Sequence, residues 1–368
     1  MWKKLFVLMM ILSSQIGGAT DQETWGIRHQ FDDKVLHARP SVGINSAQMV
    51  NQSVVLTGLG AYAVFDTGGE VRFTRDGFNA VVEAVPSSDR LLLAFGAEKW
   101  QITDIYSGEI RFSDSEAIGI MAAAFSDDES RIALGLMRGG VVLLNLLDRS
   151  RHLLFETTKF VDFVAFSPDD TKIVANDYDD AQKYLQYRVF DVRTHEELYP
   201  PLGRPGEGMA HHDFRPLFTD DGHLVTANGT YLDVHDLTSG KRVQTINGHR
   251  GRVVAVAQKP KSSVLVYGSE QGELRAWDLR EGIQPSPSEG YTDEKPIRSI
   301  HFNCDGTRML TTRDDGDTTI VIWDTSSSQP WDWKPVATLK GDKPISEASF
   351  GPHCGGVMTN RGTFWVKK

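Results

Sequence analysis

The chain has 368 residues, and 49 Asp and Glu outnumber 39 Lys and Arg, which gives a formal net charge of −10 at pH 7. Nucleic acid and anionic lipid are bound through clustered Lys and Arg, so this balance argues against either as the main partner. A hydrophobic content of 40% with eight tryptophans is ordinary for a folded globular protein and argues against disorder.

The N-terminal residues 1–19 have the pattern of a secretory leader. Lys3 and Lys4 precede an apolar run from Leu5 to Leu12, and small residues follow up to Ala19. This order predicts a signal peptide cleaved after Ala19, with a buried N-terminal helix as the alternative. The apolar run is too short to span a bilayer, and no cysteine stands near the cut to carry a lipid anchor.

Residues 20–368 are then expected to form one exported, periplasmic and monomeric domain. Losing the two leader lysines leaves 37 Lys and Arg against 49 acidic residues, a net charge of −12. No later segment has the apolar length of a membrane span, so none is expected.

Two markers recur along these residues. The first is an apolar strand that ends in Phe and continues into a polar turn rich in Asp and Gly, residues that tolerate the tight backbone of a hairpin. It ends at Phe125, Phe166, Phe218, Phe302 and Phe350. The second is a strand that ends in Asp or a substitute, at Asp66, Asp104, Asn145, Asp191, Asp236, Asp278, Asp324 and Val366.

Successive residues of the second marker are 38 to 46 positions apart. Short apolar runs separated by turns lie between the markers, without a long stretch at the helical period. This pattern predicts an all-β chain built of eight repeats.

One repeat is bracketed by Gly248-His249 and Trp277-Asp278, and Trp323-Asp324 ends the following one. On these residues, and on a period close to the expected 40–45 residues, the chain resembles a degenerate member of the WD40 family, of the exported bacterial type, over essentially all of residues 20–368. The resemblance implies a β-propeller of eight four-stranded blades, with seven blades as the alternative. We interpret His249, Trp277, Asp278, Trp323 and Asp324 as structural marks of their blades.

The family also implies a tetrad of His, Ser or Thr, Asp and Trp that is hydrogen-bonded within a blade. Here Tyr267 stands at the Ser or Thr position and Gln271 at the Asp position. The tetrad is therefore predicted to be absent, and packing is expected to stabilise this blade instead.

The last repeat offers only three strands, near 345–350, 356–359 and 363–367. We expect the N-terminal segment around Phe31–Ala38 to supply the fourth strand and so close the ring. Pairing the two ends of the chain removes the free sheet edges that would otherwise invite aggregation.

The two cysteines, Cys304 and Cys354, occupy nearly equivalent turns in the last two repeats. Equivalent turns lie on the same face of a propeller, and export permits disulfides. We hypothesise a Cys304–Cys354 disulfide that ties these two blades together, with two free thiols as the alternative.

The sequence predicts no catalytic, cofactor-binding or metal site. His211, His212, His223 and His235 match no closed ligand spacing, and Asp177, Asp179 and Asp180 lack the Gly and Glu of a calcium loop. We interpret both groups as solvated, or for the histidines as turn-capping. The alternative is a hydrolase or lyase with carboxylates at the central mouth, since glycoside chemistry needs two opposed carboxylates.

Three loops exceed the minimum of the repeat: Asn176–Tyr184, Tyr199–His212 and Ser326–Lys334. Scaffolds vary where they bind, and aromatic residues anchor interfaces. Tyr178, Tyr184, Trp331 and Trp333 are therefore the candidate partner-binding residues, while the two tryptophans have the alternative of folding back onto their blade. The expected function is a non-catalytic platform for a protein or peptide partner.

Overall fold

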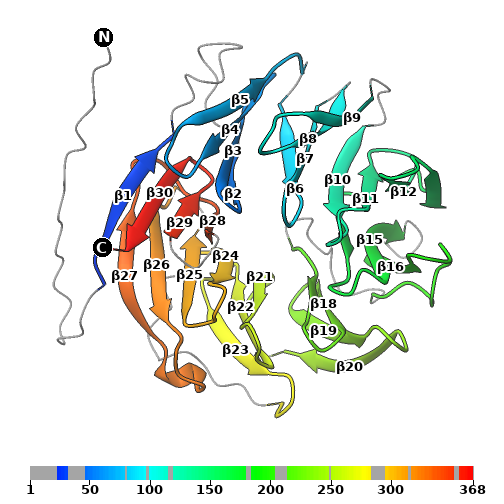
Figure 1. Ribbon diagram of the computed structural model, residues 1–368. Coiled ribbons are helices and arrows are strands. Elements are labelled where there is room, and N and C mark those ends of the chain that lie inside the picture. Colours follow the sequence, from blue (N-terminus) through cyan, green and yellow to red (C-terminus); the bar gives the residue numbers. More distant parts are fainter. Residues whose placement is uncertain are drawn as a thin grey trace, which may run out of the picture.

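The computed structural model describes residues 23–31, 46–78, 81–96, 99–114, 119–179, 184–203, 214–247, 250–282, 295–313, 316–351 and 356–367. These residues form eight antiparallel sheets arranged in a closed ring, so the chain is an eight-bladed β-propeller, as predicted (Figure 1). Within the described residues, no helix is long or apolar enough to cross a membrane.

The first three blades follow one another from the N-terminal side and have four strands each. Their strands are β2 (Ser46–Val50), β3 (Ser53–Thr57), β4 (Tyr62–Asp66) and β5 (Val71–Arg75); β6 (Glu83–Pro86), β7 (Leu91–Phe95), β8 (Trp100–Asp104) and β9 (Ile110–Asp114); β10 (Ile120–Phe125), β11 (Arg131–Leu136), β12 (Val141–Asn145) and β13 (Arg151–Phe155).

Blades 4 to 6 are less regular, because the described residues of blades 4 and 6 form three strands rather than the predicted four. The strands are β14 (Val164–Phe166), β15 (Lys172–Asp179) and β16 (Tyr184–Asp191); β17 (Leu217–Phe218), β18 (His223–Asn228), β19 (Tyr231–Asp236) and β20 (Lys241–Ile246); β21 (Val253–Gln258), β22 (Val264–Ser269) and β23 (Leu274–Asp278). In blade 4 the next described segment pairs with β16 through the isolated bridges Tyr187–Leu202 and Phe190–Glu197 instead of forming a regular strand. Pro200 and Pro201 lie between these bridges and lack the N–H groups that a regular strand needs.

Blades 7 and 8 complete the ring, and blade 8 takes its outermost strand from the N-terminal side. The elements are β24 (Ile297–Phe302), β25 (Arg308–Arg313), β26 (Thr319–Asp324), the short 3-10 helix η2 (Pro330–Asp332) and β27 (Lys334–Lys340); β28 (Ala348–Phe350), β29 (Gly356–Thr359), β30 (Thr363–Lys367) and β1 (Trp25–Gln30).

The apolar core is divided among the eight seams between neighbouring blades. Each hydrophobic cluster draws its residues from two adjacent blades, for example Val141 and Phe155 of blade 3 with Ile173 and Phe190 of blade 4. The same arrangement recurs at every seam, including the one between blades 8 and 1. Both faces of the middle strands are therefore buried, which explains why those strands have nearly continuous apolar sequences.

The residues of the Asp marker each end the third strand of a blade, apart from Val366, which is the penultimate residue of β30. Their side chains organise the turn that follows: Asp104 Oδ1 accepts hydrogen bonds from the amides of Tyr106 and Ser107 at 3.0 and 2.9 Å. Asn145, Asp191, Asp236, Asp278 and Asp324 accept equivalent bonds. This Asx turn explains the recurring Asp without any need for a preceding Trp.

The residues of the Phe marker each end an innermost strand, and the turns that follow are linked from blade to blade. The links, which also join the equivalent turns of blades without the Phe marker, include the following hydrogen bonds: Asn51 Nδ2 donates to Asp89 O (2.7 Å), Glu129 Oε1 accepts from Arg90 N (2.8 Å), Asp170 Oδ1 accepts from Asp127 N (2.9 Å) and Gln258 Oε1 accepts from Asp220 N (2.9 Å). The polar turns thus connect neighbouring blades as well as reversing the chain.

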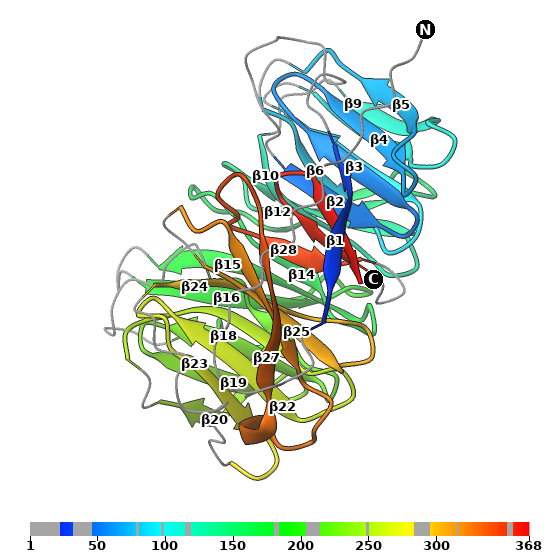
Figure 2. The ribbon, with the colours of Figure 1, turned by 90° about the vertical axis from the view of Figure 1, so that its left-hand side faces the viewer.

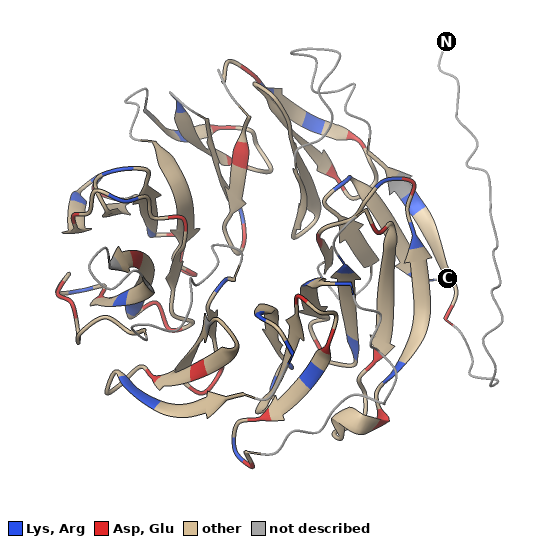
Figure 3. Ribbon diagram, turned by 180° about the vertical axis from the view of Figure 1, so that it is seen from behind, with Lys and Arg blue, Asp and Glu red and all other residues tan. Residues whose placement is uncertain are grey.

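The outermost strands β1, β5, β9, β13, β20 and β27 carry nine Lys or Arg and one acidic residue, Asp114. Figure 3 shows basic residues along the outer strands, although the whole chain is acidic. Each of these strands also has a shift of register against its neighbour. Cations and β-bulges are the features that keep edge strands from pairing with other molecules.

The ring is closed by β1, which pairs antiparallel with β30 from Trp25–Lys367 to Gln30–Thr363. Figure 2 shows β1 beside the C-terminal end of the chain. The prediction of closure by the N-terminal side is confirmed, but its position around Phe31–Ala38 is wrong. Trp25 and Ile27 alternate along β1 and pack against the seam between blades 7 and 8, whereas Phe31 follows the strand and residues 32–38 lie outside the described part.

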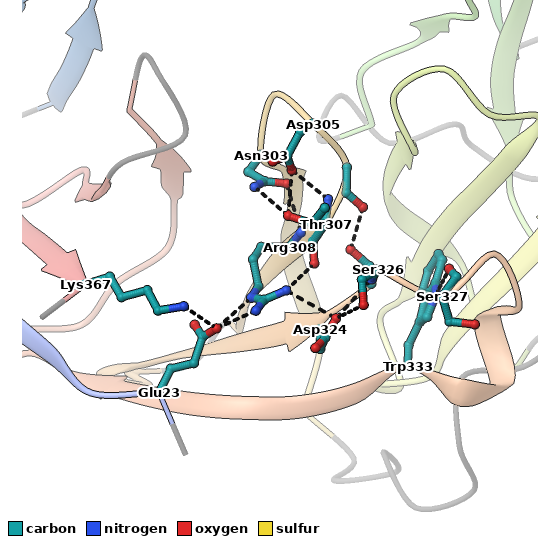
Figure 4. Close-up of polar contacts among 12 residues, drawn as sticks. Glu23, Asn303, Asp305, Thr307, Arg308, Asp324, Ser326, Ser327, Trp333 and Lys367 are labelled. Atoms are coloured by element: carbon teal, nitrogen blue, oxygen red, sulfur yellow. Dashed lines mark hydrogen bonds and ion pairs between the residues drawn. The ribbon is translucent and has the colours of Figure 1, made fainter. Parts of the chain in front are cut away.

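A cluster of ionised side chains around the largely buried Glu23 carboxylate reinforces this closure (Figure 4). The Glu23 side chain is 9% exposed, and its Oε1 accepts from Arg308 Nε at 3.0 Å and from Lys367 Nζ at 2.7 Å. Arg308 also donates to Asp324 Oδ1 at 3.2 Å. Burial disfavours the Glu23 carboxylate, but the bonds from Arg308 and Lys367 outweigh it and lower the pKa of Glu23.

Cys304 lies in the turn after β24 and is disulfide-bonded. Cys354 is the one other cysteine of the chain, and it lies outside the described residues. The proposed Cys304–Cys354 pairing therefore stays a prediction.

The buried carboxyl of Asp104 makes the stability of the protein depend on pH. Its side chain is fully buried and pairs with Arg90. Burial would raise the pKa of its carboxyl, but hydrogen bonds from the Ser107 and Tyr106 amides and from Arg90 lower that pKa from 3.8 to about 2. A carboxyl with a depressed pKa stabilises the fold above its unfolded value and loses this contribution as the pH falls through the folded value.

We therefore expect Asp104→Asn, which keeps an oxygen for the turn amides, to cost roughly 2 kcal/mol in the free energy of unfolding at pH 7. The difference from the unchanged protein should shrink as the pH falls from about 4 toward 2. Urea unfolding across this range measures it, and a difference that stays constant with pH would contradict the assignment.

Candidate functional site

The top and bottom faces of the ring carry different turns. The top face carries the turns between second and third strands together with the connections between blades, because the strands of each blade run alternately up and down. The bottom face carries the remaining turns.

The innermost strands of the eight blades surround the centre of the ring (Figure 1). On these strands, β2, β6, β10, β14, β17, β21, β24 and β28, the charged or titratable residues are Glu83, Arg298 and His301. Glycoside hydrolysis needs a pair of carboxylates, and Glu83 is the one carboxylate that these strands offer.

Three aspartates are buried in the described part of the chain, and each lies in a different blade. Asp104 pairs with Arg90 in blade 2, and Asp177 of blade 4 accepts from Arg188 Nε at 2.8 Å. Asp233 of blade 5 accepts from Thr245 Oγ1 at 2.7 Å. These are contacts within single blades, so the three carboxylates serve structure rather than a shared site.

The predicted loop Asn176–Tyr184 is mostly a hairpin, which corrects the expectation. β15 continues to Asp179 and β16 begins at Tyr184, so residues 180–183 connect two long strands. Asp177 is 7% exposed and paired, not solvated, because the strand turns its side chain toward Arg188. The side chains of Asp179 and Tyr184, and Asp180 entirely, lie outside the described part.

An apolar patch, defined as Met121, Met137 and Phe160, lies on the top face of blade 3 and of the connection to blade 4. These side chains are 39%, 53% and 42% exposed. Met121 occupies a shift of register between β10 and β11, since Ile120 pairs with Leu136 while Ala122 pairs with Gly135. Such bulges re-aim a side chain and are common beside functional sites.

The turn that carries Met137 is fixed by backbone contacts. Met137 N donates to Gly119 O at 2.7 Å, and Gly139 N donates to Thr157 O at 3.0 Å. Gly140 has φ +96°, and a Cβ at this position would lie 1.8 Å from Phe155 O. Only glycine allows this close approach of two backbone segments.

The segment that carries Phe160 is fixed from both blades. Val161 N donates to Leu136 O at 2.9 Å, which ties it to blade 3. On blade 4 the buried Asn176 donates through Nδ2 to Asp162 Oδ1 at 2.6 Å and accepts from Phe163 N at 2.9 Å. The patch is therefore presented by a fixed backbone.

Among the predicted partner-binding residues whose side chains the structure describes, Tyr178 lies on the same side of blade 4 as this patch. It is half-buried near the top end of β15, and Lys159 Nζ is 6.0 Å from the centre of its ring. Phe160 directly follows Lys159 in the chain, so Tyr178 lies near the segment that presents Phe160.

The two tryptophans of the loop Ser326–Lys334 separate into one buried and one exposed residue. Trp333 is fully buried, its ring packs edge-on against Phe302 with centroids 6.0 Å apart, and its Nε1 donates to Ser327 O at 2.9 Å. Trp333 therefore belongs to the core between blades 6 and 7, which corrects its assignment as a partner anchor (Figure 4). Trp331, at the centre of η2, is 53% exposed.

A lysine from the neighbouring blade holds the base of this loop. Lys259 Nζ donates to Thr325 O at 2.6 Å and to Ser327 O at 2.9 Å, and it lies 5.1 Å from the centre of the Trp333 ring. Burial lowers the pKa of Lys259, while Asp324 opposes this shift. Trp331 is thus displayed on a fixed base, but on the bottom face, away from the apolar patch.

The tryptophans that mark blades 6 and 7 make different hydrogen bonds. In blade 7, Trp323 Nε1 donates to Thr311 Oγ1 at 3.2 Å within the blade. In blade 6, Trp277 Nε1 instead donates at 3.3 Å to Gln244 Oε1 on blade 5. His249 lies outside the described residues.

The sequence did not single out Met121, Met137 or Phe160. Methionines and a phenylalanine near turns have no distinctive spacing, and their exposure depends on how three segments meet. The available signals were Gly119 and the pair Gly139–Gly140, because glycines at a strand end mark places where backbones approach closely.

A closed ring of small antiparallel sheets defines the class of β-propellers. The family model "WD domain, G-beta repeat" matches residues 240–278 and 288–324, which span blade 6 and most of blade 7. The chain is a β-propeller that contains WD40-type repeats in these residues.

The similar curated proteins are eukaryotic, and each aligns over part of its length. They include nuclear distribution protein PAC1-1 of Uncinocarpus reesii, 31% identical over 107 residues, which are 29% of this chain and 23% of that protein. Eukaryotic translation initiation factor 3 subunit I of Nematostella vectensis is 30% identical over 110 residues, covering 30% of this chain and 32% of that protein. THO complex subunit 6 of Homo sapiens is 27% identical over 126 residues, covering 33% and 36%.

Among solved structures, the computationally designed Ika8 protein has the same fold. The two superpose with a TM-score of 0.68 over 94% of this chain and 99% of that protein, at 17% sequence identity. This likeness concerns the fold alone.

Proposed function

We propose that this propeller is a non-catalytic platform that binds a segment of a partner protein on the apolar patch of its top face. The observation that carries the proposal is the patch itself: three large apolar side chains are held exposed on a fixed backbone. Apolar residues at fixed positions lose little entropy on binding and therefore make effective anchors. Two of the similar proteins are named as subunits of complexes, which agrees with this role.

The chemistry of the patch indicates what it binds. Met137 and Met121 have flexible, polarisable side chains that adapt to apolar surfaces. The exposed Arg138 and the half-buried Lys159 border them and can form the polar rim of an interface. The occupant is a segment of a partner protein that presents apolar side chains to the methionines and to Phe160.

We also propose that the chain is exported, to the periplasm of a bacterium, and acts there as a monomer. Three observations support export: the leader pattern of residues 1–19, the start of the closing cluster at Glu23, just after the expected cut, and the disulfide-bonded Cys304. Disulfides persist in oxidising compartments. Fractionation of cells together with N-terminal sequencing tests the proposal, and a mature protein that begins with Met1 would contradict it.

The platform proposal is tested by site-specific photo-crosslinking. A crosslinker placed at position 160 is expected to capture one defined protein, and a crosslinker at position 147 is expected not to capture it. Leu147 is the matched control, because it is 83% exposed on the bottom face of the same blade. Excess purified propeller should compete for this capture, whereas propeller with Met137→Glu should not.

Equal capture from positions 160 and 147, or equal competition by the Met137→Glu variant, would show that the patch is not the docking surface.

A further inference from the structure

The seam between blades 3 and 4 contains a pair of stacked histidines. His152 on β13 and His195 in the turn after β16 have ring centroids 4.0 Å apart and planes inclined by 28°. They come from different blades, so the contact bridges the seam. At the same seam Phe155 stacks on Phe190, with centroids 5.5 Å apart.

The backbone positions of the two rings differ. His195 has φ +64°, a left-handed conformation that is uncommon for residues other than Gly, Asn and Asp. Its amide donates to Asp191 O at 2.9 Å, which closes the turn. His152 lies in regular pairing with Leu143. The His195 ring is therefore held against blade 3 by a constrained turn.

The charges around the pair are asymmetric. Arg131 at the start of β11 acts on His195 with the same sign as a protonated imidazole, and Asp191 acts with the opposite sign. Asp148, in the turn after β12, is a carboxylate that interacts electrostatically with His152. Arg188, on β16, lies 5.0 Å over the Phe155 ring. Two adjacent imidazolium ions beside Arg131 would repel each other, since like charges at contact distance disfavour the charged form.

We propose that the His152–His195 pair makes the seam between blades 3 and 4 an acid-sensitive joint, which is closed while the rings are neutral and opens when both are protonated. The segment that presents Phe160 is bonded to Leu136 on blade 3 and to Asn176 on blade 4, so it spans this seam. The joint is a property of the fold and does not depend on the identity of any partner.

The pKa of His195 sets the direction in which stability changes with pH. Burial first, then the His152 ring and Arg131, lower the pKa of His195 below 6.5, and Asp191 opposes them. A base whose pKa is lower in the folded state binds fewer protons than it does in the unfolded chain. The contribution of His195 to stability is therefore fully present above about pH 6.5 and is lost progressively as the pH falls below that value.

The experiment compares native-state hydrogen exchange at pH 7.5 and pH 5.5, after correction for intrinsic exchange rates. Amides of β13 and β16 are expected to lose at least about tenfold more protection at the lower pH than amides of β7 and β8 in blade 2, whose strands carry no histidine. His152→Phe keeps a flat ring on β13 but cannot be protonated, and the excess loss should disappear in this variant.

Two further variants separate the joint from other histidines. Burial also lowers the pKa of His301 in blade 7, so the pH dependence of the whole protein is not diagnostic. His223→Gln in blade 5 removes a histidine that pairs with Asp221 and should leave the seam response unchanged. His195→Asn keeps a residue that tolerates the left-handed conformation and should remove the response as His152→Phe does.

A seam that loses no more protection than β7 and β8 of blade 2 would overturn the proposal. The same holds if His152→Phe and His195→Asn respond to acid like the unchanged protein.

Discussion

Gly140→Ala is expected to lower the free energy of unfolding by more than about 4 kcal/mol, the range in which backbone clashes and strain act together. The added Cβ would lie 1.8 Å from Phe155 O, and Gly140 has φ +96°. Both the turn that carries Met137 and the neighbouring β13 must move to relieve this contact. Thermal and urea unfolding of the purified variant measure the loss.

The matched control is Gly222→Ala in blade 5. Gly222 has φ +86°, but a Cβ there meets no atom within 4 Å. The control therefore isolates the conformational strain, roughly 1–2 kcal/mol. Equal losses for the two variants would contradict the claim that the close approach at Gly140 holds the top-face turn in place.

Arg308→Met is expected to cost about 3 kcal/mol, because it leaves the buried Glu23 carboxylate with Lys367 as its remaining cation. Methionine keeps the length of the arginine stem, so the change reports the lost charge and hydrogen bonds rather than lost packing. The loss should be concentrated where β1 meets β30, which hydrogen exchange of these two strands can resolve.

Arg28→Met, on the same strand β1, is the control for this variant. Arg28 is exposed, and surface changes of this kind usually stay within about 0.5 kcal/mol. If Arg28→Met cost as much as Arg308→Met, closure would depend on general charge at the rim and not on the Glu23 cluster.

The repeat structure was predictable because its markers are local. The Phe and Asp markers sit at the ends of first and third strands, where a turn needs particular residues whatever the rest of the fold does. A fixed spacing of these turns then determines the number of blades. The Asx turns show why Asn145 can replace Asp at the same position.

The features that were missed depend on contacts between distant segments. Trp331 and Trp333 are two residues apart in a polar loop, yet Lys259 of another blade and Phe302 decide that Trp333 is buried. The closing strand begins at Trp25 rather than at Phe31, because Trp25 and Ile27 fit the seam between blades 7 and 8. Sequence periodicity cannot distinguish such cases, since each candidate segment has suitable apolar residues.

The structure suggests how stability and binding are divided in this propeller. Apolar clusters fill every seam, and polar turns link several neighbouring blades on the bottom face. The edges of the blades carry cations and bulges that discourage further pairing. These features leave the top face of blades 3 and 4 as a fixed surface on which exposed apolar side chains can serve a partner.

The most direct test of the platform is the affinity of the captured partner for three purified propellers: the unchanged protein, one with Met137→Glu and Phe160→Ser, and one with Leu147→Glu. We predict that the double change weakens binding about 30-fold or more, as expected for the loss of two interface anchors, while Leu147→Glu binds like the unchanged protein. Equal affinities of the unchanged protein and the double variant would contradict the assignment of the apolar patch as the binding surface.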